Sequence, residues 1–84
     1  PSVLKLTASW CGPCRVYKPI FEKIATEYQN INFYEIDVDD EPEIAEILGI
    51  RSIPTTIFIS KKGEKQLSLG TISQEKLRTI VKEL

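Results

Sequence analysis

The sequence predicts an α/β protein in three layers, with a mixed β-sheet flanked by helices. Strand-like and helix-like periodicities alternate along most of the chain, in the order β-α-β-α-β. A glycine turn at residues 60–64 then joins two strand-like segments, and a last helical segment follows. Helices between the early strands predict parallel pairing with right-handed crossovers, and the late hairpin predicts an antiparallel edge.

Four segments have the composition of strands. The first is apolar on both faces apart from Lys5 and Thr7, and the second alternates between apolar and polar residues. The third is rich in β-branched residues, and the fourth returns after the glycine turn as its antiparallel partner. The predicted strands are residues 3–8, 31–38, 55–59 and 65–69.

Three segments have helical spacing of apolar residues: 12–28, 39–49 and 73–84. The first contains Pro19, which predicts a kink. The second opens on acidic residues and a proline, has capping-box spacing between Asp40 and Glu43, and ends at Gly49. Ser73 is the predicted cap of the third. The predicted apolar faces are Val16, Ile20, Phe21, Ile24, Ala25 and Tyr28; then Ile44, Ile47 and Leu48; then Leu77, Ile80, Val81 and Leu84.

The length and charge limit the classes of protein to consider. A chain of 84 residues predicts one small domain over residues 1–84. A net charge of −1 gives no electrostatic reason to expect binding to nucleic acid or an anionic membrane, and no apolar run approaches the ~20 residues that span a bilayer. The chain starts in a strand-like segment without a methionine, so we expect a fragment that lacks one or two N-terminal elements, and a lost targeting segment stays open.

The only cysteines, Cys11 and Cys14, lie between the first strand and the first helix. A structural disulfide, half of an intermolecular zinc site and a redox pair are the alternatives. A loop this short is a poor crosslink, and a zinc site would need two further ligands in a chain without histidine. A helix N-terminus favours a thiolate, so we favour the redox pair, with Cys11 as the attacking thiol at an exposed tip and Cys14 as the deeper resolving thiol.

The chain resembles the thioredoxin family from end to end. Trp10 to Cys14 reads WCGPC, the family's active-site motif, and residues 49–55 (GIRSIPT) resemble the segment with its cis-proline. Gly70 and Pro19 resemble a glycine after the last strand and a helix-kinking proline. The resemblance implies the thioredoxin fold and a general protein disulfide reductase, cytoplasmic and monomeric, that acts on disulfide-containing client proteins. It further implies electrons from thioredoxin reductase and no cofactor beyond the Cys11–Cys14 disulfide.

The same resemblance implies a substrate-binding surface around the cysteines. The peptide bond before Pro54 would be cis, so that the backbone of Ile53 faces outward and pairs with an extended client like an added strand. The rim that receives the client would consist of Trp10, Gly12, Pro13, Ile53, Gly70 and Thr71. For Trp10, packing in the core is the alternative.

Two positions depart from the family pattern. Thioredoxins usually bury an aspartate beneath the active site with a lysine on the neighbouring strand, whereas this chain has Lys5 and Glu35 at the matching positions. A lysine in an apolar strand must reach water or a carboxylate. Both side chains could reach solvent and have no role, or Glu35 or neutral Lys5 could accept the proton of Cys14, or Lys5 could stabilise a thiolate directly.

Other functions remain as alternatives at this point. A dedicated or extracytoplasmic thioredoxin-like reductase would serve one client, and a non-catalytic module of the same fold would only bind partners. The acidic residues at 37–43 lack the glycine and ligand spacing of an EF-hand loop, and helix initiation already explains them, so no metal is expected there.

Overall fold

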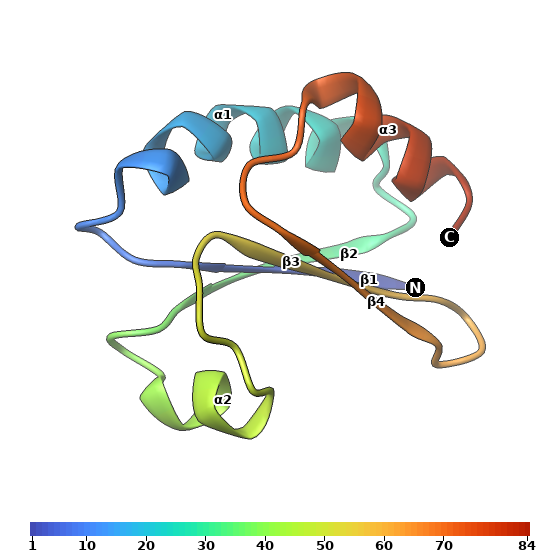
Figure 1. The fold of residues 1–84 in the computed structure, drawn as a ribbon. Helices are drawn as coiled ribbons and strands as arrows, with labels where there is room; N and C mark the ends of the chain where they lie inside the picture. The colour runs from blue at the N-terminus through green and yellow to red at the C-terminus, as the bar shows by residue number, and fades with distance from the viewer.

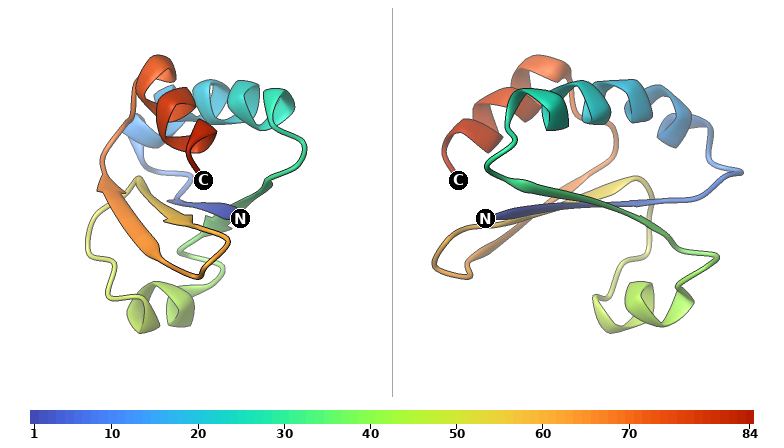
Figure 2. Two further views of the ribbon diagram at one scale, coloured as in Figure 1. Left: turned by 90° about the vertical axis from the view of Figure 1, so that its right-hand side faces the viewer. Right: turned by 180° about the vertical axis from the view of Figure 1, so that it is seen from behind.

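A computed structural model describes residues 1–84 as a four-stranded sheet with helices on both faces (Figure 1). Helices α1 and α3 lie over one face and the short α2 lies on the other, as both views of Figure 2 show. The predicted three-layer α/β arrangement is therefore confirmed. The elements are β1 (Ser2–Thr7), α1 (Gly12–Glu27), β2 (Asn32–Asp37), α2 (Pro42–Ile47), β3 (Thr55–Ile59), β4 (Lys65–Leu69) and α3 (Gln74–Lys82).

The strand order is β2-β1-β3-β4, and the sheet is mixed. Strands β1 and β2 are parallel, as predicted, and β3 and β4 form the predicted antiparallel hairpin. The expectation of parallel pairing across the second helical connection is wrong, because β3 lies antiparallel to β1 and not beside β2.

With this direction, the second connection (residues 38–54) does not have to run the length of the sheet. Helix α2 has only six residues, so it is about 9 Å long at 1.5 Å per residue. A parallel crossover would have to return the chain along a whole strand, about 20 Å for six residues. In the register of the sheet, Leu6 pairs with both Ile36 and Thr55, so β3 begins at the edge where β2 ends. Residues 38–54 therefore leave and re-enter the sheet at the same end of its strands, and α2 does not have to span the length of a strand.

The main core lies between the sheet and helices α1 and α3. Val3 of β1 and Phe58 of β3 are neighbours in the sheet and both are buried. The nine buried residues of this cluster are Val3, Tyr17, Phe21, Ile24, Ile31, Phe58, Ile72, Leu77 and Val81. The prediction for α1 was wrong at Val16, which is exposed, and missed Tyr17, whose ring is buried. The buried face of α1 is thus Cys14, Tyr17, Phe21 and Ile24.

Helix α2 differs from its prediction in two ways. Its N-cap is Glu41, without a side-chain bond, so the Asp40–Glu43 capping box does not form. The reason is a preceding turn, in which the N–H groups of Asp40 and Glu41 both donate to the carbonyl of Asp37. Helix α2 also buries no residue completely, and Ile47, expected on its apolar face, is 82% exposed.

Helix α3 begins at its predicted cap, which provides a test of the local structure. The Ser73 hydroxyl accepts a hydrogen bond of 3.2 Å from the backbone N–H of Lys76. Replacing Ser73 by alanine should lower the free energy of unfolding by about 1 kcal/mol, since this N–H loses its partner. Urea denaturation of Ser73→Ala and of Ser73→Asp, which keeps an acceptor, checks the prediction; equal losses in both variants would contradict it.

No helix of the chain combines the length and the apolar composition that crossing a membrane requires.

Candidate functional site: a disulfide at the start of helix α1

Cys11 and Cys14 form a disulfide at the N-terminus of α1, with their Cα atoms 5.2 Å apart. Cys11 is the N-cap, in an extended conformation, and its sulfur accepts a hydrogen bond of 3.2 Å from the backbone N–H of Cys14. Donation from the first turn of a helix to this sulfur stabilises negative charge there. The geometry therefore suits Cys11 as a thiolate when the disulfide is reduced.

The structure corrects the expected exposure of Cys11. Its side chain is 5% exposed and that of Cys14 is 3% exposed, so both are buried and neither forms an exposed tip. The reason is the packing of two segments distant in sequence, because Val38 and Ile53 cover the cluster formed by Ala8 and the two cysteines. Val38 and Ile53 therefore limit access to the sulfur of Cys11.

The segment before β3 lies against the disulfide. The Ile53–Pro54 peptide bond is cis, and the carbonyl oxygen of Ile53 is 3.9 Å from the sulfur of Cys11. The carbonyl of Pro54 accepts a hydrogen bond of 2.8 Å from the N–H of Gly70, which has a φ of 83°. A positive φ favours glycine, so Gly70 lets the chain after β4 close against this proline.

The backbone of Ile53 has unused hydrogen-bonding groups. Neither its N–H nor its carbonyl is paired with another backbone group. Since the residue lies just before the start of β3 and flanks the disulfide, an extended peptide could pair with it there.

The predicted rim residues lie around the disulfide. Trp10 is 66% exposed, which excludes the alternative that it packs in the core. Gly12 and Pro13 are also exposed, and the Thr71 hydroxyl donates to the carbonyl of Pro13 at 3.4 Å. This bond and the one between Gly70 and Pro54 tie the loop after β4 to the start of α1 and to the start of β3.

Sequence reasoning missed Asp39, which positions the tryptophan. The indole N–H of Trp10 donates to the Asp39 carboxylate at 2.8 Å, across 29 positions of sequence. The acidic residues at 37–43 were explained as a helix start, and nothing in the sequence distinguishes Asp39 among them. Val38, which packs against the disulfide, was likewise expected only as a strand residue.

Lys5 and Glu35 form an ion pair beneath α1. The two residues are direct neighbours in the parallel pairing of β1 with β2, and the Lys5 Nζ lies 2.8 Å from the Glu35 Oε1. The Lys5 side chain is 1% exposed and that of Glu35 is 45% exposed. The alternative that both side chains reach solvent is therefore wrong for Lys5, which reaches a carboxylate at the surface.

Two aromatic rings also lie near the ammonium of Lys5. Its Nζ lies 4.8 Å from the ring centre of Phe21 and 5.9 Å from that of Tyr17, at distances where a cation is attracted to a ring face. The Tyr17 hydroxyl forms a 2.7 Å hydrogen bond with Thr56, and burial raises the pKa of this phenol. No buried side-chain polar atom lacks a hydrogen-bond partner, so the site buries the ammonium without orphaned groups.

The ion pair predicts a dependence of stability on pH. The hydrogen bond from Lys5 holds the pKa of Glu35 below its usual value of 4.5, against the opposing effect of burial. Because the folded state then binds the proton less well than the unfolded state, the stabilisation is complete above about pH 4.5 and is lost as the pH falls through the folded pKa. The free energy of unfolding of Glu35→Gln should therefore lie below that of the wild type at pH 7 and approach it at about pH 3.

Urea denaturation at both pH values measures this difference. Glu22→Gln is the matched control, since Glu22 is an exposed carboxylate on α1 whose nearest ammonium, that of Lys18, is 3.8 Å away. A difference between Glu35→Gln and the wild type that stays constant with pH would contradict the assignment.

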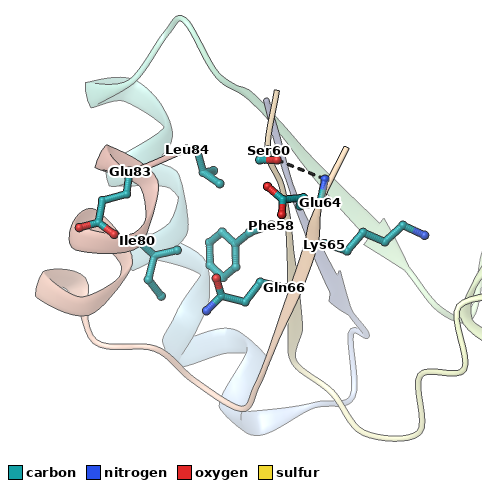
Figure 3. Close-up of a pocket in the computed structure, with 8 residues that line it drawn as sticks. All are labelled: Phe58, Ser60, Glu64, Lys65, Gln66, Ile80, Glu83 and Leu84. Atoms are coloured by element: carbon teal, nitrogen blue, oxygen red, sulfur yellow. Dashed lines mark hydrogen bonds between the residues drawn. The ribbon is translucent and has the colours of Figure 1, made fainter. Parts of the chain in front are cut away.

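Two clefts differ in their relation to the disulfide. One of about 300 Å³ opens beside Cys14 and contains the side chain of Glu35. Its complete lining is Thr7, Ala8, Ser9, Cys14, Arg15, Lys18, Glu35 and Asp37. The other, of about 500 Å³, lies between the β3–β4 hairpin and the end of α3; Figure 3 shows its apolar wall of Phe58, Ile80 and Leu84. None of the predicted site residues lines this second cleft. The structure contains no group of three or more His, Cys, Asp or Glu side chains that could hold a metal ion.

The chain is similar to known thioredoxins over nearly its whole length. A family model described as Thioredoxin matches residues 1–83. The thioredoxin of Borreliella burgdorferi is 38% identical in an alignment that covers 99% of this chain and 72% of that protein. The thioredoxin of Homo sapiens is also 38% identical, and the alignment covers 98% of this chain and 77% of that protein. The solved structure of oxidised mitochondrial thioredoxin 3 from Saccharomyces cerevisiae superposes with a TM-score of 0.86 at 30% identity, covering 99% of this chain and 77% of that one. The Cys11–Cys14 disulfide supports a redox function for this chain. The motif and the fold of the chain, together with these similarities, show that it belongs to the thioredoxin family.

Proposed function

We propose that this protein is a general reductase of protein disulfides. The observation that carries the proposal is the Cys11–Cys14 disulfide at a helix N-terminus, lying against the backbone of Ile53. In its reduced form the protein would have one thiol that the helix activates and a second thiol within bonding distance.

The reaction proceeds by two exchanges. The Cys11 thiolate attacks one sulfur of the client disulfide, so that a Cys11–client disulfide forms and the other client sulfur leaves as a thiolate. Cys14 then loses its proton and attacks the Cys11 sulfur, which forms the Cys11–Cys14 bond and releases the second client thiolate. The client gains two electrons and two protons, and the protein is oxidised by the same amount.

The surface around the disulfide accounts for binding. An extended client segment pairs with the free backbone groups of Ile53 and packs against the exposed face of Trp10. Gly12, Pro13, Pro54, Gly70 and Thr71 complete this surface. Backbone pairing is independent of the client's side chains, which favours a broad range of clients over a single one. Thioredoxin reductase is the proposed electron donor.

Reduction of insulin by dithiothreitol tests this function. The protein is expected to accelerate the reaction catalytically, and several unrelated disulfide proteins should be reduced at comparable rates. Activity on one client alone would favour a dedicated reductase. If the wild-type protein leaves the rate of insulin reduction by dithiothreitol unchanged, the proposal is overturned in favour of a binding module.

A further inference from the structure

The disulfide borders a cleft at Cys14 and not at Cys11. Exposure hardly distinguishes the two side chains, at 3% and 5%. However, the cleft of about 300 Å³ is lined by Cys14 alone of the two, and no other cleft of the structure reaches either cysteine. Cys11 lies instead against the backbone of Ile53, whose carbonyl oxygen is 3.9 Å from its sulfur. The cleft has the volume of a site for a small molecule, for which the range begins at about 300 Å³, so a small reactant would meet the disulfide at Cys14.

The two sulfurs also differ as leaving groups. When a thiolate attacks one sulfur of a disulfide, the other sulfur leaves, and it leaves faster where its negative charge is stabilised. Cys11 is the N-cap of α1, and its sulfur accepts the backbone N–H of Cys14 at 3.2 Å, so the helix stabilises a thiolate at this position. Attack on the sulfur of Cys14, which expels Cys11, is therefore the direction that the local electrostatics favour.

The part of the cleft that α1 provides is cationic. Arg15 and Lys18 lie there. Arg15 is engaged by the loop before the helix, because its Nη2 donates to the carbonyl of Ser9 at 3.1 Å. Lys18 is 55% exposed, and the carboxylate paired with it, that of Glu22, is 3.8 Å away and equally exposed to solvent. A pair of this kind contributes little, so the ammonium of Lys18 is available to an anion in the cleft.

The part of the cleft that β2 provides is anionic. Glu35 is occupied by its ion pair with Lys5. Asp37 accepts the N–H of Asp39 through Oδ1 at 2.8 Å, and its Oδ2 has no hydrogen-bond partner within the protein. The cleft therefore offers an available ammonium and an available carboxylate oxygen beside the disulfide. This arrangement is complementary to a small molecule that has both a carboxylate and an ammonium group.

We propose that this cleft admits a small zwitterionic thiol, of the amino-acid class, which reduces the oxidised protein by attack on the sulfur of Cys14. The carboxylate of the thiol faces Lys18, and its ammonium faces Asp37. The inference rests on the proposed reductase function and adds to it a second electron donor, independent of thioredoxin reductase.

The reduction consists of two exchanges and consumes two small thiols. The thiolate of the first bonds to the sulfur of Cys14, the Cys11–Cys14 bond breaks, and Cys11 leaves as a thiolate. The thiolate of the second attacks the sulfur of the first, so that a small disulfide forms and Cys14 leaves as a thiolate. The two small thiols lose two electrons and two protons, and the protein gains them. Cys11 is then ready to attack a client.

The position of the first new bond tests the proposal directly. The oxidised protein is mixed with L-cysteine, quenched in acid at successive times and treated with N-ethylmaleimide. Both cysteines lie in the tryptic peptide of residues 6–15, and fragmentation of this peptide in the mass spectrometer locates each added group. At the earliest times we expect the added L-cysteine on Cys14 and the maleimide on Cys11. The reverse distribution at those times overturns the proposal.

The rates of reduction by four thiols of similar size test the charges of the cleft, even where the intermediate is too short-lived to trap. Mercaptoethanol has neither charge, mercaptopropionate has the carboxylate, cysteamine has the ammonium, and L-cysteine has both. Rate constants are compared per thiolate, which is the attacking species. Lys18→Gln should slow mercaptopropionate and L-cysteine about threefold, the effect of one exposed ion pair, and Asp37→Asn should slow cysteamine and L-cysteine about as much. Neither variant should change the rate with mercaptoethanol.

The controls separate this site from a general effect of charge or folding. Lys23→Gln removes an exposed ammonium of α1 that lies outside the cleft, so it should leave all four rates unchanged. Asparagine at position 37 keeps the oxygen that accepts the N–H of Asp39, so the loop retains this bond. Equal effects of Lys18→Gln on all four thiols, or equal effects of Lys18→Gln and Lys23→Gln, overturn the proposal. A wild type that shows the expected rates with small thiols but does not accelerate insulin reduction refutes the reductase function alone.

Discussion

Replacing Cys11 by serine is expected to abolish disulfide reduction, so that insulin is reduced no faster than by dithiothreitol alone. The physical reason is that a hydroxyl forms no thiolate at neutral pH and cannot make the mixed disulfide on which both exchanges depend. The helix that activates the sulfur of Cys11 cannot compensate for the loss of the nucleophile itself.

Cys14→Ser is the matched variant for this prediction. It keeps the attacking thiol of Cys11 but lacks the thiol that resolves the mixed disulfide. It should therefore accumulate a disulfide-linked complex with the client, which dithiothreitol cleaves. Non-reducing electrophoresis and mass spectrometry detect that complex. Complex formation by Cys11→Ser and not by Cys14→Ser would reverse the two assignments.

Replacing Glu35 by alanine is expected to lower the free energy of unfolding by about 2–3 kcal/mol. The substitution leaves the ammonium of Lys5, which is 1% exposed, without a carboxylate, and removing one partner of a buried ion pair costs about 3–5 kcal/mol. We expect a value below that range because water can enter where the half-exposed carboxylate was.

The matched comparison is with variants that remove the charge of Lys5. Lys5→Met leaves Glu35 free to be hydrated, so the loss should be about 1 kcal/mol. Lys5→Met/Glu35→Gln should be close to the wild type, since a buried pair contributes little beyond what apolar groups of similar size would. Urea denaturation at pH 7 measures all three variants. A double variant as unstable as Glu35→Ala would show that the packing around Tyr17 and Phe21 requires the cation.

Much of the site was predictable because its signal is local. The WCGPC motif, the helix that follows it and the proline at position 54 are read from adjacent residues. The exact bounds of β3 and β4 and the cap at Ser73 were predicted for the same reason. Each of these features depends on backbone preferences and side chains within a few positions of one another.

The predictions from sequence were wrong or incomplete where contacts between residues distant in sequence determine whether a side chain is buried or held in place. Cys11 is buried because Ile53 and Val38 pack against it. Trp10 is held by Asp39, and Val16 is exposed because the buried face of α1 runs through Tyr17. None of these contacts follows from spacing along the chain.

By itself, the sequence determined the order of the elements, the pairing of β1 with β2 and the redox motif, since periodicity, turn residues and cysteine spacing act over short distances. Only the tertiary structure decided the direction of β3 and the burial of the lysine at position 5. Lys5 lies in an apolar strand and its carboxylate is 30 positions away on the neighbouring strand, at a distance of 2.8 Å. Whether a charge in such a strand is paired or unpaired depends on strand register, and register is a property of the folded sheet.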